Sequence, residues 1–245
     1  MADKPRLAGS SLSQLPVVTW TLSVIAIALP MSADWSDWLS YDRTAIAAGE
    51  FWRLITGHLT HWNTDHMVWD VFMFAWLGSM IERDDRSRLI ATLLFSAADI
   101  STTMWFCQPA VEQYRGLSGI DSALFLSVAI TLLYEKCRAK QPIAALALVA
   151  LMIGFVAKLV FEVATGTTLF VDSSAAGFTP LPFVHAVGGS AGAVALFYGN
   201  HKQVPAFCSV LNRPAATTDD TPELIRVRVS SQNGRRRGAW LARRG

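Results

Sequence analysis

The sequence is poor in charged residues for a chain of its length. Of its 245 residues only 16% are charged, against about 25% in ordinary soluble domains, while 52% are hydrophobic and the mean hydropathy is +0.33. So few charges beside so many apolar residues argue against an ordinary soluble enzyme, and the apolar excess also excludes disorder as the main state. The formal net charge of +2 is too small to indicate nucleic-acid binding by itself.

Cysteine is also scarce, and the three cysteines lie far apart in the chain. Cys107, Cys137 and Cys208 are too few and too scattered to form a disulfide framework or a zinc site. The sequence therefore indicates no metal and no cofactor.

The apolar residues come in blocks near the length of a membrane span, which needs about 20 mostly apolar residues. These blocks predict transmembrane helices over 15–31, 65–81, 89–107, 118–134, 142–164 and 181–198. The first block could instead be a signal peptide, but no clear small-residue cleavage site follows it. We expect an all-α membrane protein with a six-helix domain over 15–200, between an N-terminal segment (1–14) and a basic, disordered tail (201–245).

Lysine and arginine set the expected orientation, because they concentrate in cytoplasmic loops. With the N-terminus inside, ten of them fall on the cytoplasmic side and three outside. The inner set is Lys4, Arg6, Arg83, Arg86, Arg88, Lys136, Arg138, Lys140, Lys202 and Arg213, and the outer set is Arg43, Arg53 and Arg115. We therefore expect both termini in the cytoplasm, with the tail either solvated or touching anionic lipid. The outer loop from Ser32 to Thr64 contains four tryptophans, which favours a position partly in the lipid headgroup layer.

Ionisable side chains inside the predicted spans are the first functional candidates. Each costs about 2.5–3.5 kcal/mol at mid-bilayer, so such residues usually serve a function. They are His66, Asp70, Asp99, Asp121, Lys158, Glu162 and His185. In the expected topology most of them converge in the outer half of the bundle, whereas chance polar substitutions would scatter in depth.

Ser118 and His185 lie at a similar depth on two different predicted helices. Ser118 opens its helix within the sequence GLSG, whose glycines allow a tight turn and a close approach of substrate. The free N–H groups of a helix N-terminus can stabilise an oxyanion, and a histidine can take the serine proton as general base. The pair therefore predicts acyl-transfer chemistry. Gly188 and Gly192 form a GxxxG pattern that predicts close packing of the sixth span against the fourth.

Three motifs in this order resemble those of the rhomboid family of intramembrane serine proteases. They are Trp52-Arg53 followed by Thr56, His61 and His66; Gly116-Leu117-Ser118-Gly119; and His185 followed by Gly188 and Gly192. The resemblance covers about residues 15–200 and implies a six-helix bundle with a water-filled cavity open to the outer side. It implies Ser118 as nucleophile and His185 as base, in the bacterial inner membrane. It also implies that His66 helps to bind the oxyanion, with Asp70, Gly116 and Gly119 at the supporting positions.

Two positions depart from the family pattern. Asp70 stands where rhomboids have an asparagine, and an ionised carboxylate cannot donate a hydrogen bond to an oxyanion, whereas a protonated one can. Asp70 is therefore either a neutral donor or a sign of altered activity. Asp121 and Ser122 follow Ser118 by three and four residues, where many rhomboids have an aromatic residue at the fourth. Asp121 is a candidate to orient His185, and a structural link between helices is an equal alternative.

The pair Lys158 and Glu162 resembles the rhombosortase branch, bacterial enzymes that trim proteins bearing a C-terminal Gly-Gly, a helix and a basic cluster. A structural ion pair between the two is the simpler interpretation. We expect a serine endopeptidase that cleaves transmembrane protein substrates near their outer membrane boundary. Its other expected partner is membrane lipid, and we expect no nucleic-acid partner. The alternatives are a pseudoprotease that holds membrane clients without cutting, which Asp70 favours, and an ion-coupled transporter, which lacks the expected inverted repeat.

Overall fold

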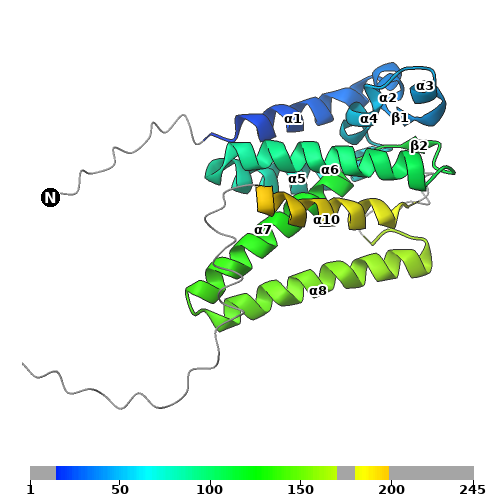
Figure 1. The fold of residues 1–245 in the computed structure, drawn as a ribbon. Coiled ribbons are helices and arrows are strands. Elements are labelled where there is room, and N and C mark those ends of the chain that lie inside the picture. The colour runs from blue at the N-terminus through cyan, green and yellow to red at the C-terminus, as the bar shows by residue number, and fades with distance from the viewer. Residues whose placement is uncertain (1–14, 170–179, 199–245) are drawn as a thin grey trace, which may run out of the picture.

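The computed structural model describes residues 15–169 and 180–198, so the expectations for 1–14 and for the tail lie outside the described residues. Helices stand at each of the six predicted segments. They are α1 (Val17–Ala28), α5 (Thr64–Asp84), α6 (Arg86–Cys107), α7 (Ser118–Arg138), α8 (Pro142–Thr165) and α10 (Pro182–Tyr198). Figure 1 shows α10 between α6 and α8, with α7 crossing obliquely and α8 at the edge of the bundle.

Three of the described helices, α6, α7 and α8, are long and apolar enough to cross a membrane. The pair Val17–Met31 and Ala33–Leu39, bent by 119° at its break, would add a fourth if it is one span, and α10 is a shorter apolar helix. The chain is therefore a helical membrane protein by length and composition of its helices. The count of six crossings stays a prediction.

Local signals fix the ends of the long helices. The side chain of Asn63 accepts the N–H of His66 and begins α5, and that of Asp85 begins α6 directly after α5 ends. Pro142 opens α8, where its missing N–H costs nothing, and Gly166 ends α8 with a positive φ of 66°. The cap at Asn63 places His66 in the first turn of α5.

A buried carboxylate caps the start of α1, which has no capping side chain of its own. Glu82, near the end of α5 and 4% exposed, accepts the N–H groups of Val18 and Thr19 at 3.0 and 2.8 Å. It also accepts the Thr19 hydroxyl at 2.8 Å and Arg86 Nε at 2.9 Å. Four donors thus compensate one buried charge, and they tie α1 to α5 at the end remote from His66.

The segment between α1 and α5 is an ordered cap of short elements. It contains the 3₁₀ turns η2 (Leu29–Met31) and η3 (Gly57–Leu59), the helices α2 (Ala33–Leu39), α3 (Arg43–Ala47) and α4 (Arg53–Thr56), and the strand β1 (Tyr41–Asp42). The strand pairs in antiparallel fashion with β2 (Gln113–Tyr114), with Tyr41 opposite Tyr114. This cap is therefore joined to the chain just before Ser118.

Arg53 holds this cap together from inside. Its guanidinium donates to the carboxylate of Glu50 at 2.6 Å and to the carbonyls of Asp37 and Ser40 at 2.7 and 2.9 Å. These bonds join α2 and the residue that follows it to α4, so the arginine ties together short elements that have few buried apolar side chains. The ring of Trp38 contacts both Trp35 and Trp52, with centroids 5.8 and 5.4 Å apart. All three rings are exposed, and their position in the headgroup layer stays a prediction.

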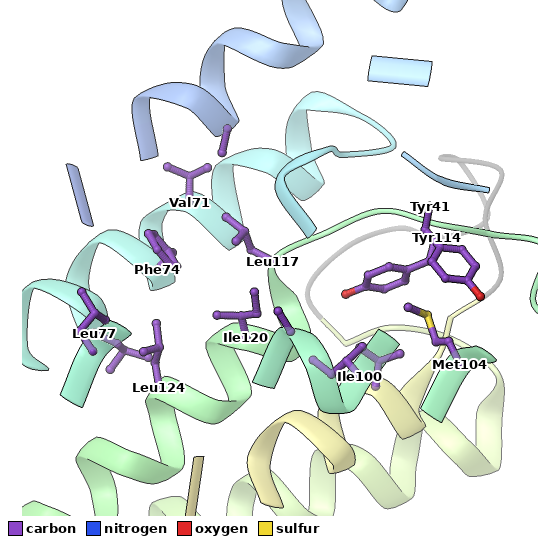
Figure 2. Close-up of a cluster of buried hydrophobic side chains, with 14 of the residues drawn as sticks. Tyr41, Val71, Phe74, Leu77, Ile100, Met104, Tyr114, Leu117, Ile120 and Leu124 are labelled. Atoms are coloured by element: carbon purple, nitrogen blue, oxygen red, sulfur yellow. The ribbon is translucent and has the colours of Figure 1, made fainter. Parts of the chain in front are cut away.

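The apolar core lies between α5, α6 and α7. Figure 2 shows Val71, Phe74 and Leu77 of α5, Ile100 and Met104 of α6, and Ile120 and Leu124 of α7, with Tyr41 and Tyr114 at one end. The two tyrosines are buried and lie opposite each other across the β1–β2 pair. The core therefore fixes the cap and the start of α7 relative to α5.

Helix α10 packs most extensively against α7, through backbone that glycine leaves uncovered. A Cβ built on Gly188 would lie 1.9 Å from the carbonyl oxygen of Gly119, and one on Gly192 would lie 2.0 Å from that of Ala123. Since both contacts advance by four residues along each helix, α7 and α10 run in the same direction. The close packing that the GxxxG pattern predicts is confirmed.

Substitution of Gly188 by alanine should therefore destabilise the protein by about 1–3 kcal/mol or more, because the added methyl overlaps backbone that cannot rotate away. Gly154→Ala is the matched control, since Gly154 lies within α8 and a Cβ added there would meet nothing within 4 Å. The control should gain about 0.5–1 kcal/mol from helix propensity. Unfolding in detergent micelles, followed by circular dichroism, measures both. A Gly188→Ala protein as stable as wild type would contradict the packing.

His58 is a buried polar group that joins the cap to α6. It is 2% exposed, and its Nε2 lies 3.1 Å from the hydroxyl of Ser101, which donates to the carbonyl of Leu54. The serine lone pair can thus accept the N–H of a neutral imidazole. Burial lowers the pKa of His58 to about 4, because the charged form would lose its hydration.

The stability contributed by neutral His58 should be complete above pH 6.5 and should fall as the pH drops toward 4, because only the unfolded chain binds the proton over that range. The loss amounts to about 3 kcal/mol for a shift of this size. His58→Gln should lack this part of the pH dependence, while Ser101→Ala should keep it at lower overall stability. Denaturant unfolding at several pH values tests this, and equal slopes in wild type and His58→Gln would contradict it.

Candidate active site

A cavity of about 1130 Å³ opens between α5, α7, α8 and α10, beside β2. Most of the ionisable residues singled out from the sequence line it, together with Ser118: these are His66, Asp70, Asp121, Lys158, Glu162 and His185. Asp99 is the exception, because it is exposed on α6 and is not among the lining residues. The fold thus brings side chains from four helices to one site.

The turn before Ser118 depends on Gly116, whose φ of 132° is strained for any other residue. Its N–H donates to the carbonyl of Gly57, and its carbonyl accepts the hydroxyl of Tyr114 at 2.7 Å. Burial, and next the negative charges of Asp70 and Asp121, raise the pKa of Tyr114, so that its hydroxyl keeps the proton that it donates. The turn ends at Ser118, the first residue of α7.

Asp70 lies against this turn, on the side of α5. Its Oδ2 accepts the N–H of Leu117 at 2.9 Å, and the Nε2 atoms of His66 and His61 lie 3.2 and 3.4 Å from the same oxygen. A Cβ on Gly116 would lie 2.9 Å from His66 and 3.1 Å from Asp70, so the glycine is also needed for space. The geometry makes Oδ2 an acceptor, and a neutral Asp70 would have to donate through Oδ1.

His185 stands in the first turn of α10, next to the contact with α7. A Cβ on Gly119 would lie 2.5 Å from the side chain of Val184. Ser118 precedes Gly119 and His185 follows Val184, so the two candidate residues lie at a similar height along two parallel helices. The Nδ1 atom of His185 lies 3.1 Å from Oε2 of Glu162 on α8. Ser118 and His185 both line the cavity.

Lys158 completes a three-member polar group with Glu162 and His185. Its Nζ lies 2.7 Å from Oε1 of Glu162 and 3.3 Å from Nδ1 of His185. The ion pair considered from the sequence is therefore present. In α8, all of which is described, Glu162 is the only buried residue, at 1% exposure.

Asp121, the candidate from the sequence to orient His185, has a different environment. It is buried one turn after Ser118 and lines the cavity, and its Oδ1 has no hydrogen-bond partner within the described part of the chain. Among the described contacts, Glu162 is the carboxylate beside Nδ1 of His185, and the role of Asp121 stays a prediction. The spacing of Lys158 and Glu162 signalled a pair at this depth, but it could not signal that the pair would meet His185.

The site can hold a nucleophile and a base at the start of a helix, which suits attack on a carbonyl carbon. Among residues 15–169 and 180–198, no group of three His, Cys, Asp or Glu side chains has the geometry to hold a metal ion. The fold and the cavity define a helical membrane protein with a serine and a histidine in a polar site.

A family model of the Rhomboid domain matches residues 48–199, which is more than half of the chain. The chain therefore belongs to the rhomboid family, whose members are generally serine intramembrane proteases. No curated protein matches the sequence. The rhomboid family expected from the sequence is thus confirmed, and the rhombosortase subtype stays a prediction.

Proposed function

We propose that the chain is an intramembrane serine endopeptidase in which Ser118 is the nucleophile and His185 the general base. The observation that carries the proposal is that both residues line one cavity, at neighbouring positions of two helices in backbone contact. Such contact fixes the separation of the two backbone positions from which these side chains extend. Pre-positioning of this kind is a large part of what an active site contributes to rate.

In the proposed reaction Ser118 Oγ attacks the scissile carbonyl carbon and its proton passes to His185 Nε2. The imidazolium then protonates the leaving amine as the C–N bond breaks, and water hydrolyses the acyl-enzyme by the reverse transfer. The N–H of Ser118, at the start of α7, and the side chain of His66 are the proposed oxyanion donors. The N–H of Leu117 is already engaged by Asp70 and is not among them.

The proposed substrate is a transmembrane protein cut near its outer membrane boundary. The expected orientation, with both termini in the cytoplasm of a bacterium and the cavity toward the outer side of the inner membrane, is part of this proposal. For the substrate class we propose proteins with a C-terminal Gly-Gly, a helix and a basic cluster, on the rhombosortase model. The pair of Lys158 and Glu162 in the cavity supports this class.

One observation favours a second candidate, a rhomboid pseudoprotease that holds membrane clients without cutting them. Asp70 places a carboxylate within 3.2 Å of His66, where an oxyanion would have to bind. If that carboxylate is charged, it repels the intermediate and weakens catalysis. The two candidates differ in whether Ser118 is chemically reactive.

A fluorophosphonate serine probe in native membranes should label the wild-type chain, since Ser118 Oγ displaces fluoride from phosphorus while His185 takes the proton. Ser118→Ala should abolish labelling, and His185→Ala should reduce it by at least about 10³-fold. Ser122→Ala, one turn further along α7, is the matched control and should still be labelled. Absence of labelling in folded wild-type protein would contradict the protease and favour the pseudoprotease.

Asp70→Asn should retain or raise the labelling rate. The amide oxygen can still accept the N–H of Leu117, while the amide nitrogen adds a donor and removes the charge that repels an oxyanion. Asp99→Asn makes the same change outside the cavity and should leave the rate unchanged. A large loss of labelling in Asp70→Asn, with normal folding, would contradict this account of Asp70.

A further inference from the structure

The Nδ1 atom of His185 has two polar neighbours that require opposite protonation states. Glu162 Oε2 lies at 3.1 Å and Lys158 Nζ at 3.3 Å. A carboxylate only accepts hydrogen bonds and an ammonium only donates them. Nδ1 can therefore bond to Glu162 only when it carries hydrogen, and to Lys158 only when it does not.

The other contacts of the group decide between the two states. Lys158 is already satisfied by Oε1 of Glu162 at 2.7 Å, and that oxygen also accepts the N–H of Leu169 at 3.4 Å. Within the described residues the contact of Oε2 is with His185, and Glu162 is almost fully buried, where an unmet acceptor is costly. The lysine has no comparable need, since its Nζ has one strong partner and its side chain is partly exposed at 19%.

We infer that Glu162 is a positioning residue that fixes His185 as the Nδ1-protonated tautomer, against the opposite tendency of Lys158. This tautomer leaves the lone pair on Nε2, the atom that takes the serine proton in the proposed reaction, and the inference rests on that proposed function. Lys158 balances the charge of Glu162 and holds its other oxygen. The Ser118–His185 pair thereby gains a third member from α8.

Removal of the carboxylate should change the tautomer of His185. Lys158 then becomes the nearest group to Nδ1 and donates to it, which moves the proton of the neutral imidazole to Nε2. His185 in that state cannot accept the proton of Ser118. Loss of Glu162 should therefore slow the reaction of Ser118 because Lys158 remains. Removal of Lys158 as well should restore part of the rate.

The test measures the inactivation rate constant and the affinity of a fluorophosphonate probe separately, per mole of folded protein. Glu162→Met, similar in size, should lower the rate constant by about 10²–10⁴-fold with little change in probe affinity. Glu162→Asp should recover most of that loss, since it restores the acceptor. The double variant Glu162→Met with Lys158→Met should react at least about 10-fold faster than Glu162→Met alone.

Glu82→Gln is the matched control, because it alters another buried carboxylate, near the end of α5 remote from His66, whose partners lie in α1 and α6. It should lower the melting temperature and leave the inactivation rate constant unchanged. A Glu162→Met protein with the wild-type rate constant would overturn the inference. So would a slow Glu162→Met protein that loss of Lys158 does not accelerate.

Histidine ¹⁵N NMR reads the tautomer directly and does not depend on activity. The His185 signals, assigned by their loss in His185→Ala, should show hydrogen on Nδ1 in wild type and on Nε2 in Glu162→Met. Hydrogen on Nε2 in the neutral wild-type side chain would overturn the inference even if the probe labels Ser118. A wild-type protein that the probe does not label, but that has hydrogen on Nδ1, would contradict the proposed function and leave the tautomer assignment supported.

Discussion

The rest of the site depends on the backbone contact between α7 and α10. Gly188 meets the carbonyl of Gly119 and Gly192 meets that of Ala123, at separations that a side chain would not permit. Water plays no part in driving helices together within a bilayer, so packing of this closeness is a main source of association there. Because the helices run in the same direction, their first turns meet. The first turns are where Ser118 and His185 stand.

Each buried carboxylate that caps or joins the long helices has a nearby set of donors. Glu82 caps α1 and accepts four hydrogen bonds in all, and Asp70 accepts the N–H of Leu117. Glu162 lies against a lysine and a histidine. Charge at these depths is costly without such partners. The three carboxylates have different roles, since Glu82 joins α1 to the end of α5 remote from the cavity while Asp70 and Glu162 line the cavity.

Helix α8 differs from the other long helices in how it is held. Apart from Glu162 its side chains are not buried, and its packing against α10 is slight compared with that of α7. The polar contact of Glu162 with His185 is therefore a principal link between α8 and the helix that carries the proposed base. Any movement of α8 away from the bundle would separate this pair. The orientation of the His185 imidazole therefore depends on the position of α8.

Much of the fold could be predicted from the sequence, because the information was local. Apolar blocks near span length marked all six long helices within a few residues, and GxxxG predicted the contact of α10 with α7. The short elements between α1 and α5 were not predicted. Arg53, a strand of two residues and two paired tyrosines hold that cap, and such contacts between distant segments leave no periodic signal.

The sequence by itself determined the family and the helix on which each polar residue lies, since motif spacing and hydrophobic length are properties of the chain. Which polar groups meet was decided by the tertiary structure. The sequence offered Asp121, one turn from Ser118, as a candidate to orient His185, and it gave no sign that Glu162 of α8 would lie 3.1 Å from the imidazole. The angular position of one helix against another depends on side-chain packing along its whole length. In the structure Glu162 of α8 lies against His185 of α10, and Asp70 of α5 lies against the turn before Ser118.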